Sequence, residues 1–257
     1  MRAARETGPS SRVKGQVLDV VYLCRSGPNE ELRYSLRSLR FVEHERVWIF
    51  GDPPGWVEGV EVIKIAQGSN KYANAQAALL AICSHPEISE SFVLMNDDFF
   101  ALRPTTVNPL HWGRLDRIVD LYYDARIKES RYMVYMSRTL AALRALKIKR
   151  PLCYELHVPM VFEKAKLAPI IETSGFSVGL LFRSMYGNVY RIGGERIEDV
   201  KVYARGGMLP EFEEWVSSDD VAFDYVREAA LEGILGEPGP YERAGSVGRG
   251  RTIGVLP

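Results

Sequence analysis

Short apolar runs that end abruptly in polar, turn-forming residues constrain the fold of this chain more than any other feature. The runs are Gln16–Leu23 (QVLDVVYL), which stops at Cys24-Arg25-Ser26-Gly27-Pro28; Val47–Phe50 (VWIF), which stops at a Gly-Asp-Pro-Pro-Gly turn; and Ser91–Met95 (SFVLM), which leads into Asn96-Asp97-Asp98. Runs of β-branched and aromatic residues between Gly, Pro, Asn and Asp are typical of buried strands. We therefore predict strands at these positions and a further short strand at Val60–Ile65.

Helical patterns separate the predicted strands. Asn29 is placed to cap a helix whose first turn holds Glu30 and Glu31, with leucines following at helical spacing. Further helices are expected at Ala73–Ile82 and, in a more helical C-terminal half, at Leu115–Tyr123, Ser137–Leu146, Phe162–Ile171 and Val221–Ile234. The alternation predicts an α/β fold with a mixed, mostly parallel sheet and helices on both faces. Ligands of such sheets bind at the carboxyl ends of the strands, where Arg25 and Asp98 are expected.

The charge balance and the cysteines indicate which partners and which cellular setting the protein has. The chain of 257 residues has 33 basic and 33 acidic residues, so no global field draws it onto nucleic acid or an anionic membrane, although a local basic pocket is not excluded. The aromatic residues lie in apolar runs more than among basic residues, and we expect no nucleic-acid partner. Three cysteines without the spacing of a zinc site suggest reduced thiols in a cytoplasmic setting.

The two ends of the chain differ from its middle. No apolar run approaches the roughly 20 residues that a membrane helix needs, and residues 1–14 are polar and basic without an apolar stretch behind them. We therefore expect no integral membrane segment, no export and a cytoplasmic location. Residues 1–14 and 243–257 have too little apolar content to fold alone. They are predicted to be a mobile leader and a mobile tail around a single domain, residues 15–242.

Oxygen-bearing side chains cluster where the Ser91–Met95 strand ends. If the strand continued, Asn96 and Asp98 would share one face and Asp97 would point to the other. Oxygen ligands at the spacing of Asn96 and Asp98 suit Mg²⁺ or Mn²⁺ bridging two phosphates, so we expect a divalent metal at Asn96-Asp97-Asp98. The alternative is a solvated turn, in which Asn and Asp are common. The two phenylalanines that follow favour a packed turn, where buried carboxylates need a partner or a metal.

Two further residues carry the features of reactive groups. His157 lies in an apolar segment just before Pro159, which places it on a loop or strand end. A histidine side chain ordinarily titrates near pH 6.5, so His157 could accept a proton from an attacking hydroxyl. The alternative is that His157 is a hydrogen-bonded residue of the core. Arg183 follows the apolar stretch Phe176–Leu181. Its guanidinium can donate two parallel hydrogen bonds to phosphate oxygens, which would suit a phosphate-binding role. The alternative is a buried structural ion pair. Ser217–Asp220 is equally well explained as a helix cap.

Together these segments resemble the Stealth family of sugar-phosphate transferases, which includes bacterial capsule enzymes and the lysosomal-targeting N-acetylglucosamine phosphotransferase. The matching segments are Asp19–Tyr22 (DVVY); Glu31–Leu39 (ELRYSLRSL) with Ser89–Phe92 (SESF) and Asn96–Phe100 (NDDFF); His157–Pro159 (HVP) with Phe182–Ser184 (FRS); and Ser218–Asp220 (SDD) with Gly236–Glu242 (GEPGPYE). The second group is the most specific. The resemblance runs from Asp19 to Glu242.

The resemblance implies a fold, a reaction and residue roles. The fold would be of the nucleotide-diphospho-sugar transferase (GT-A-like) type, and the single domain would be catalytic. An acceptor hydroxyl on a glycan, a polymer or a protein would attack the sugar-linked phosphate of a UDP-sugar-like donor. His157 would be the base, Arg183 would stabilise the transferring phosphoryl group, and Asp98 would act beside them. Asp97 and Asp98 would bind the Mg²⁺ or Mn²⁺ ion, and Arg33, Asn96 and Asp97 would bind the donor.

One position departs from the family pattern. After the opening strand, the family usually has Thr-Trp-Val-Asp, whereas this chain has Leu23-Cys24-Arg25-Ser26. Arg25 would then bind the donor's pyrophosphate directly. The sequence leaves two alternatives open: a metal-dependent glycosyltransferase that transfers the sugar alone, and an inactive carbohydrate-binding relative.

Overall fold

The computed structural model describes residues 17–66, 68, 70–124, 130–174, 179–203, 209 and 214–245. The predicted leader, residues 1–14, and residues 246–257 of the predicted tail lie outside the described residues. At the start of that tail, the backbone N–H of Arg243 donates a hydrogen bond to the carbonyl of Trp56 (2.8 Å). The first residue of the predicted tail is therefore attached to the rest of the fold.

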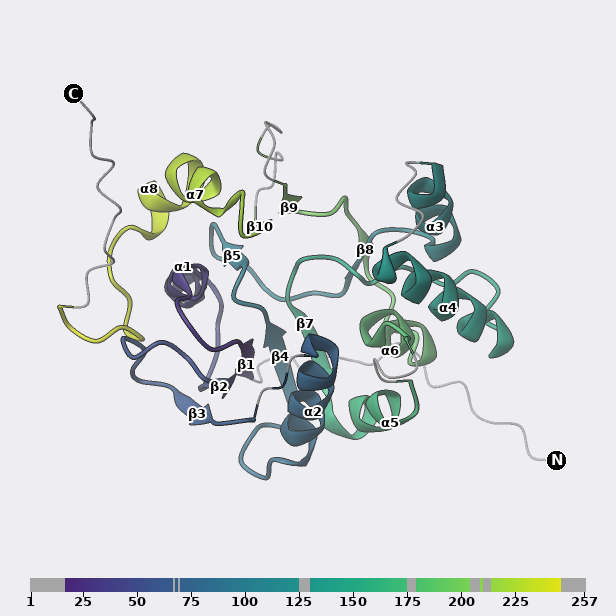
Figure 1. Ribbon diagram of the computed structural model, residues 1–257, viewed down its shortest axis with the longest axis horizontal. Coiled ribbons are helices and arrows are strands. Elements are labelled where there is room, and N and C mark those ends of the chain that lie inside the picture. Colours follow the sequence, from purple (N-terminus) through teal and green to yellow (C-terminus); the bar gives the residue numbers. More distant parts are fainter. Residues whose placement is uncertain are drawn as a thin grey trace.

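A five-stranded sheet forms the centre of the molecule (Figure 1). Its strands, in spatial order, are β3 (Glu61–Ile63), β2 (Val47–Gly51), β1 (Asp19–Cys24), β4 (Ser91–Met95) and β7 (Met160–Glu163). The first four are parallel, and β7 runs antiparallel to β4. The prediction of an α/β fold with a mostly parallel sheet is confirmed, and the apolar runs in the sequence locate β1, β2 and β4 closely.

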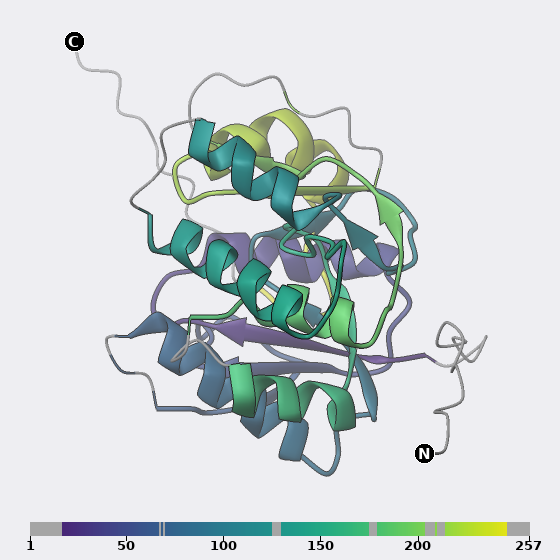
Figure 2. The same ribbon diagram turned by 90° about the vertical axis from the view of Figure 1, so that its right-hand side faces the viewer.

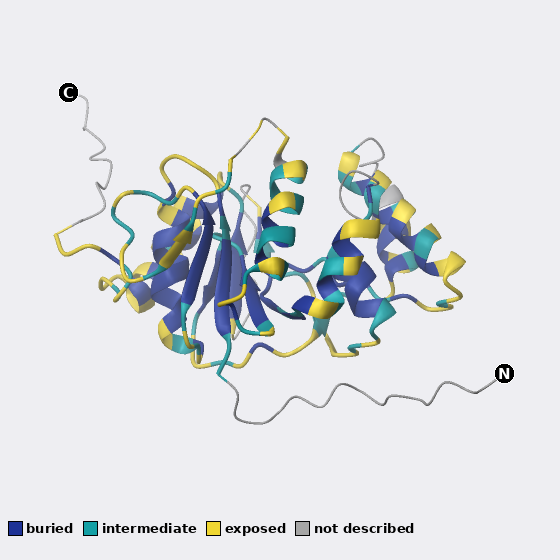
Figure 3. Ribbon diagram, turned by 90° about the horizontal axis from the view of Figure 1, so that it is seen from below, coloured by how far each residue is buried: buried dark blue, intermediate teal, exposed yellow. Residues whose placement is uncertain are grey.

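Helices cover both faces of this sheet (Figures 1 and 2). They are α1 (Glu30–Ser38) on one face, and α2 (Lys71–Ser84) and α5 (Lys164–Ser174) on the other. Side chains of β1 alternate accordingly, since Val20 and Tyr22 pack in the hydrophobic cluster that includes α1, whereas Val21 packs in the cluster that includes α2 and α5. The strands are therefore buried between two helical layers (Figure 3). The predicted cap of α1 is confirmed, because Asn29 Oδ1 accepts a hydrogen bond from the Leu32 N–H (2.9 Å).

A second, three-stranded sheet lies on the outer side of α1. It consists of β5 (Phe99–Ala101), β10 (Trp215–Ser218) and β9 (Lys201–Val202), followed by α7 (Phe223–Val226), a π-helical segment (Arg227–Leu231) and α8 (Glu232–Leu235). Tyr34 of α1 packs in one hydrophobic cluster with Phe100, Val216 and Phe223. Helix α1 is thus enclosed on both sides, which explains why its residues from Glu31 to Ser38 are all buried.

The remaining elements are α3 (Leu115–Asp124), α4 (Arg131–Ala145), α6 (Phe182–Val189), β6 (Leu110–His111) and β8 (Glu195–Arg196). The predicted helix at Phe162–Ile171 is wrong at its start, because Phe162 belongs to β7 and pairs with Phe92 in the sheet. Both of these side chains are fully buried. The helix α5 begins only at Lys164, so tertiary pairing overrides the local helical pattern.

Arg33, which the resemblance places at the donor, belongs instead to a buried ion network. Its Nη1 lies 2.5 Å from Glu242 Oε2, and Arg37 Nε lies 2.6 Å from Glu242 Oε1. The Arg33 guanidinium also stacks over the Trp56 ring, 4.1 Å from its centroid. Burial alone raises the Glu242 pKa, but the hydrogen bonds from Arg37, the Gly239 N–H and Arg33 outweigh it and hold that pKa below its ordinary value. The network fastens the C-terminal segment to α1.

Candidate active site

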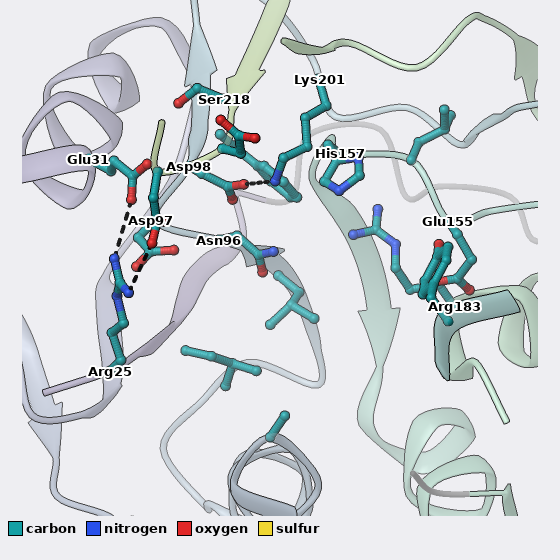
Figure 4. A pocket seen from close by; sticks show the side chains of 18 of the residues that line it. Arg25, Glu31, Asn96, Asp97, Asp98, Glu155, His157, Arg183, Lys201 and Ser218 are labelled. Carbon is teal, nitrogen blue, oxygen red and sulfur yellow. Dashed lines mark hydrogen bonds and ion pairs between the residues drawn. The ribbon is translucent and has the colours of Figure 1, made fainter. Parts of the chain in front are cut away.

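A pocket of about 730 Å³ opens at the carboxyl ends of β1 and β4 (Figure 4). Following the chain, the sheet grows from β1 to β2 and β3 on one side and then continues with β4 on the other. The direction of growth therefore reverses between β1 and β4, and such a switch point is where parallel α/β sheets bind ligands. The volume lies in the usual range for small-molecule sites.

Six of the seven predicted site residues line this pocket. They are Arg25, Asn96, Asp97, Asp98, His157 and Arg183. Arg33 does not line it, and its guanidinium pairs instead with Glu30 in the first turn of α1 and with Glu242 in the C-terminal segment. His157 reaches the pocket because β7 runs antiparallel beside β4, with Met160 opposite Leu94. The loop before β7 therefore lies next to the residues that follow β4, and the predicted loop position of His157 is confirmed.

The two phenylalanines after the turn that follows β4 are buried, as predicted, whereas Asn96, Asp97 and Asp98 are half-buried at the pocket. Phe99 and Phe100 are 1% and 0% exposed, and the Phe99 N–H donates to the Asn96 carbonyl (3.3 Å). Because the strand ends at Met95 and the chain turns, the expected alternation of faces does not apply. Asn96, Asp97 and Asp98 all line the pocket.

Carboxylates gather at one end of the pocket. Asp97 Oδ2 accepts a hydrogen bond from Asn29 Nδ2 (2.6 Å), and burial followed by the neighbouring charge of Asp98 raises the Asp97 pKa. Glu31, in the first turn of α1, has its pKa raised to about 7 by burial and then by the charges of Asp97, Asp220 and Asp98. Its Oε1 is buried and has no hydrogen-bond partner among the described residues. This acidic end is thus only partly neutralised.

Arg25 spans the acidic end. Its guanidinium lies 3.7 Å from Glu31 and 3.5 Å from Asp220, which precedes α7 (Figure 4). The Arg25 side chain is 55% exposed, so water screens both contacts. An arginine held this loosely can exchange its carboxylate partners for phosphate oxygens at small cost.

Asp98 has a cationic partner of its own. Lys201 Nζ lies 2.9 Å from Asp98 Oδ2, and Ser217 Oγ donates to the same oxygen (3.2 Å). The second sheet brings these groups together, since Ser217 pairs with Phe99 on one side and with Lys201 on the other. Asp98 is therefore more fully neutralised than Asp97.

His157 forms a dyad with Asp199. Its ring Nδ1 lies 2.8 Å from Asp199 Oδ2, and its backbone N–H donates to Oδ1 of the same carboxylate (3.0 Å). Burial raises the Asp199 pKa, but the His157 hydrogen bond outweighs it and holds that pKa below its ordinary value. An ionised carboxylate only accepts hydrogen bonds, so Nδ1 carries the proton. The neutral ring then has its lone pair on Nε2, as a general base requires.

Arg183 lies in the first turn of α6, beside His157. Its Nε donates to the Tyr154 carbonyl (3.1 Å) and its Nη2 to the Val158 carbonyl (2.5 Å). Burial lowers the Arg183 pKa, and the nearby charge of Glu155 opposes this effect. Arg183 makes no ion pair within 4 Å with a described carboxylate, but the buried Glu155 is the main opposing charge, so the alternative of a buried structural pair stays open. Figure 4 shows the guanidinium pointing toward His157, on the same side of the pocket.

The acidic end fits a divalent cation supplied with a phosphate ligand. The described residues include no group of three or more His, Cys, Asp or Glu side chains that forms a metal site from protein alone. Mg²⁺, however, is usually held by one or two carboxylates together with substrate phosphates. A cation near Asp97 and Glu31 would stabilise the ionised forms of both carboxylates, whose pKa values are raised.

Several pocket residues escape prediction from the sequence. Glu31 looks only like a favourable residue for the first turn of a helix, and nothing near Lys201 or Asp199 in the sequence marks them as functional. Asp199 reaches His157 across 42 residues and Lys201 reaches Asp98 across 103. At Ser217–Asp220, Asp219 Oδ1 accepts from the Ala222 N–H (2.7 Å). Helix α7, however, begins only at Phe223, and its N-cap residue Ala222 has no side-chain cap hydrogen bond, so the predicted cap is not formed.

Comparisons with known proteins do not assign the chain to a family. No protein-family model matches the chain, and no curated protein matches it in sequence. Within the part of the chain that the structure describes, no helix has both the length and the apolar character to cross a membrane. Function is therefore inferred from the pocket residues and their chemistry.

Proposed function

We propose that this protein transfers a sugar-1-phosphate from a UDP-sugar-like donor to an acceptor hydroxyl on a glycan or another polymer, as members of the Stealth family do. The observation that carries the proposal is one pocket in which the His157–Asp199 dyad and Arg183 face a partly neutralised acidic end at a sheet switch point. This arrangement supplies a base, an anion-stabilising group and a cation-binding group for one substrate. A GT-A-like fold is part of the proposal.

The donor diphosphate is proposed to lie between the acidic end and Arg183. Arg25 and Lys201 are the cations available to its oxygens on the acidic side, once they release their carboxylate partners. Asp97 and Asp98 would hold a Mg²⁺ or Mn²⁺ ion, which when bound offsets the charge of the diphosphate and of the departing nucleotide. Phosphoryl transfer needs mainly such alignment and charge neutralisation.

The chemical step is proposed to begin at His157. Its Nε2 accepts the proton of the acceptor hydroxyl as that oxygen attacks the sugar-linked phosphorus, and Asp199 stabilises the resulting imidazolium. Arg183 donates to the oxygens of the transferring phosphoryl group. A new P–O bond to the acceptor forms while the bond between the two donor phosphates breaks, and nucleoside monophosphate leaves.

Ligand-induced thermal stabilisation tests the donor class. With Mg²⁺ present, a UDP-sugar at about 100 times its dissociation constant should stabilise the fold by about 2.7 kcal/mol and raise the melting temperature. The effect should shrink with EDTA, because the ion and the diphosphate bind together. A panel of nucleotide sugars with free nucleosides and free sugars as controls identifies the donor; if free sugars alone stabilise the protein, a carbohydrate-binding role replaces the proposed enzyme.

A further inference from the structure

Helices α3 and α4 form a locally basic face on a chain that is neutral overall. The two helices lie side by side on the same side of the molecule (Figure 2). Residues 114–121 and 130–150 hold eight arginines and lysines but only two acidic residues, Asp116 and Asp120. The whole chain, in contrast, has 33 of each sign. We call residues 114–121 and 130–150 the basic face.

Among the side chains that the structure describes, most cations of the basic face have no acidic partner. Asp116 pairs with Arg114 (2.6 Å) and Arg144 (3.6 Å). The cations that form no ion pair with a described acidic side chain are Arg117, Arg131, Arg138, Lys147, Lys149 and Arg150. Unpaired charges repel one another, so an anionic surface that covered them would be attracted and would relieve that repulsion.

The outward surface of α4 also carries apolar side chains. Arg131, Val134 and Arg138 are exposed at helical spacing, while Met133, Met136 and Leu140 on the opposite side are buried. Large apolar side chains are exposed on α3, on α4 and directly after α4, with Leu121 at 57%, Val134 at 41% and Leu146 at 57%. Cations interleaved with exposed leucines are the composition of helices that lie in a bilayer interface.

We propose that the basic face docks on an anionic lipid bilayer. A bilayer uses both features of the face, because lipid phosphates attract the unpaired cations and the acyl boundary takes up Leu121 and Leu146. A soluble polyanion would use the cations alone and would gain nothing from the leucines. Tyr132 of α4 also lines the pocket, so docking through this face holds the pocket near the bilayer.

Vesicle co-sedimentation of the full chain, without any donor, tests the docking. The protein should sediment with vesicles of phosphatidylcholine and phosphatidylglycerol, less so at high salt, and not with phosphatidylcholine alone. The triple substitution Arg138→Glu, Lys149→Glu and Arg150→Glu should weaken binding about tenfold or more. The matched control, Lys64→Glu, Arg103→Glu and Arg243→Glu, makes the same change in charge on exposed residues outside the basic face and should bind as the wild type does.

A second pair of variants separates a bilayer from a soluble polyanion. Leu121→Ser with Leu146→Ser should weaken vesicle binding several-fold and leave heparin binding unchanged, and circular dichroism should confirm that each variant is folded. Two results would overturn the proposal: no binding of wild type to the mixed vesicles, or vesicle binding that the leucine substitutions do not affect and that heparin reproduces. Neither result bears on the pocket, since no donor is present.

Discussion

Replacing His157 with glutamine lowers the rate of sugar-phosphate transfer by about 10²- to 10⁴-fold, while donor binding stays close to that of wild type. The physical reason is the dyad, in which Asp199 fixes the proton on Nδ1 and leaves Nε2 to accept the acceptor's proton. Glutamine keeps a polar side chain of similar reach but cannot act as a base at neutral pH. Steady-state rates, with donor affinity measured separately by calorimetry, check this result.

Two further variants show whether the effect belongs to the dyad. Asp199→Asn should also lower the rate, because an amide can donate to the ring and favour the tautomer with its lone pair on Nδ1. The control is His44→Gln, since His44 is also hydrogen-bonded and partly buried but contacts Tyr241 outside the pocket. Transfer at the wild-type rate by His157→Gln would show that His157 is not the base for the acceptor hydroxyl.

Asp97→Asn weakens metal-dependent donor binding by about 100-fold or more, because loss of even an outer-shell partner of a metal costs about 10- to 100-fold in affinity. Asparagine keeps the oxygen that accepts from Asn29 but removes the charge that would attract a cation. Titration of a UDP-sugar with Mg²⁺ by calorimetry checks the loss. Asp52→Asn, at an exposed carboxylate that does not line the pocket, is the matched control and should bind donor normally.

The same substitution should stabilise the protein when EDTA removes divalent ions. Burial and the Asp98 charge raise the Asp97 pKa above its ordinary value of 3.8. The folded state then holds this proton more tightly than the unfolded state, so ionisation of Asp97 destabilises the fold as the pH rises above 3.8. At neutral pH, Asp97→Asn should melt at a higher temperature than wild type, and the difference should vanish at acidic pH. A lower melting temperature at neutral pH would contradict this electrostatic account.

The sequence predicts the parts of the structure that depend on residues close together in the chain. The strands β1, β2 and β4 follow from apolar runs between turn residues, and the cap of α1 follows from Asn29. The burial of Phe99 and Phe100 after β4 is also predicted correctly, although the Asn96–Asp98 turn before them is only half-buried. Proximity of Arg25 to the Asn96–Asp98 turn follows from one general property of parallel sheets.

Contacts between residues far apart in the sequence determine the other parts of the site and fold, and the sequence does not predict these contacts. Arg33 is expected at the donor, but it pairs with Glu242, 209 residues away, and does not line the pocket. The partners of His157 and Asp98 arrive through β9 and the segment before it, whose position depends on pairing with β10. The start of α5 was misplaced for the same reason, because β4 recruits Phe162 into the sheet.

The identity of the nucleotide that leaves tests the proposed reaction most directly. The full chain is incubated with a UDP-sugar and Mg²⁺, with the His157→Gln variant as the control, and the products are separated by chromatography. The proposed reaction predicts that UMP accumulates with wild type and not with the variant, since in that reaction the attacked atom is the sugar-linked phosphorus. Accumulation of UDP without UMP would contradict sugar-phosphate transfer and would assign the pocket to transfer of the sugar alone.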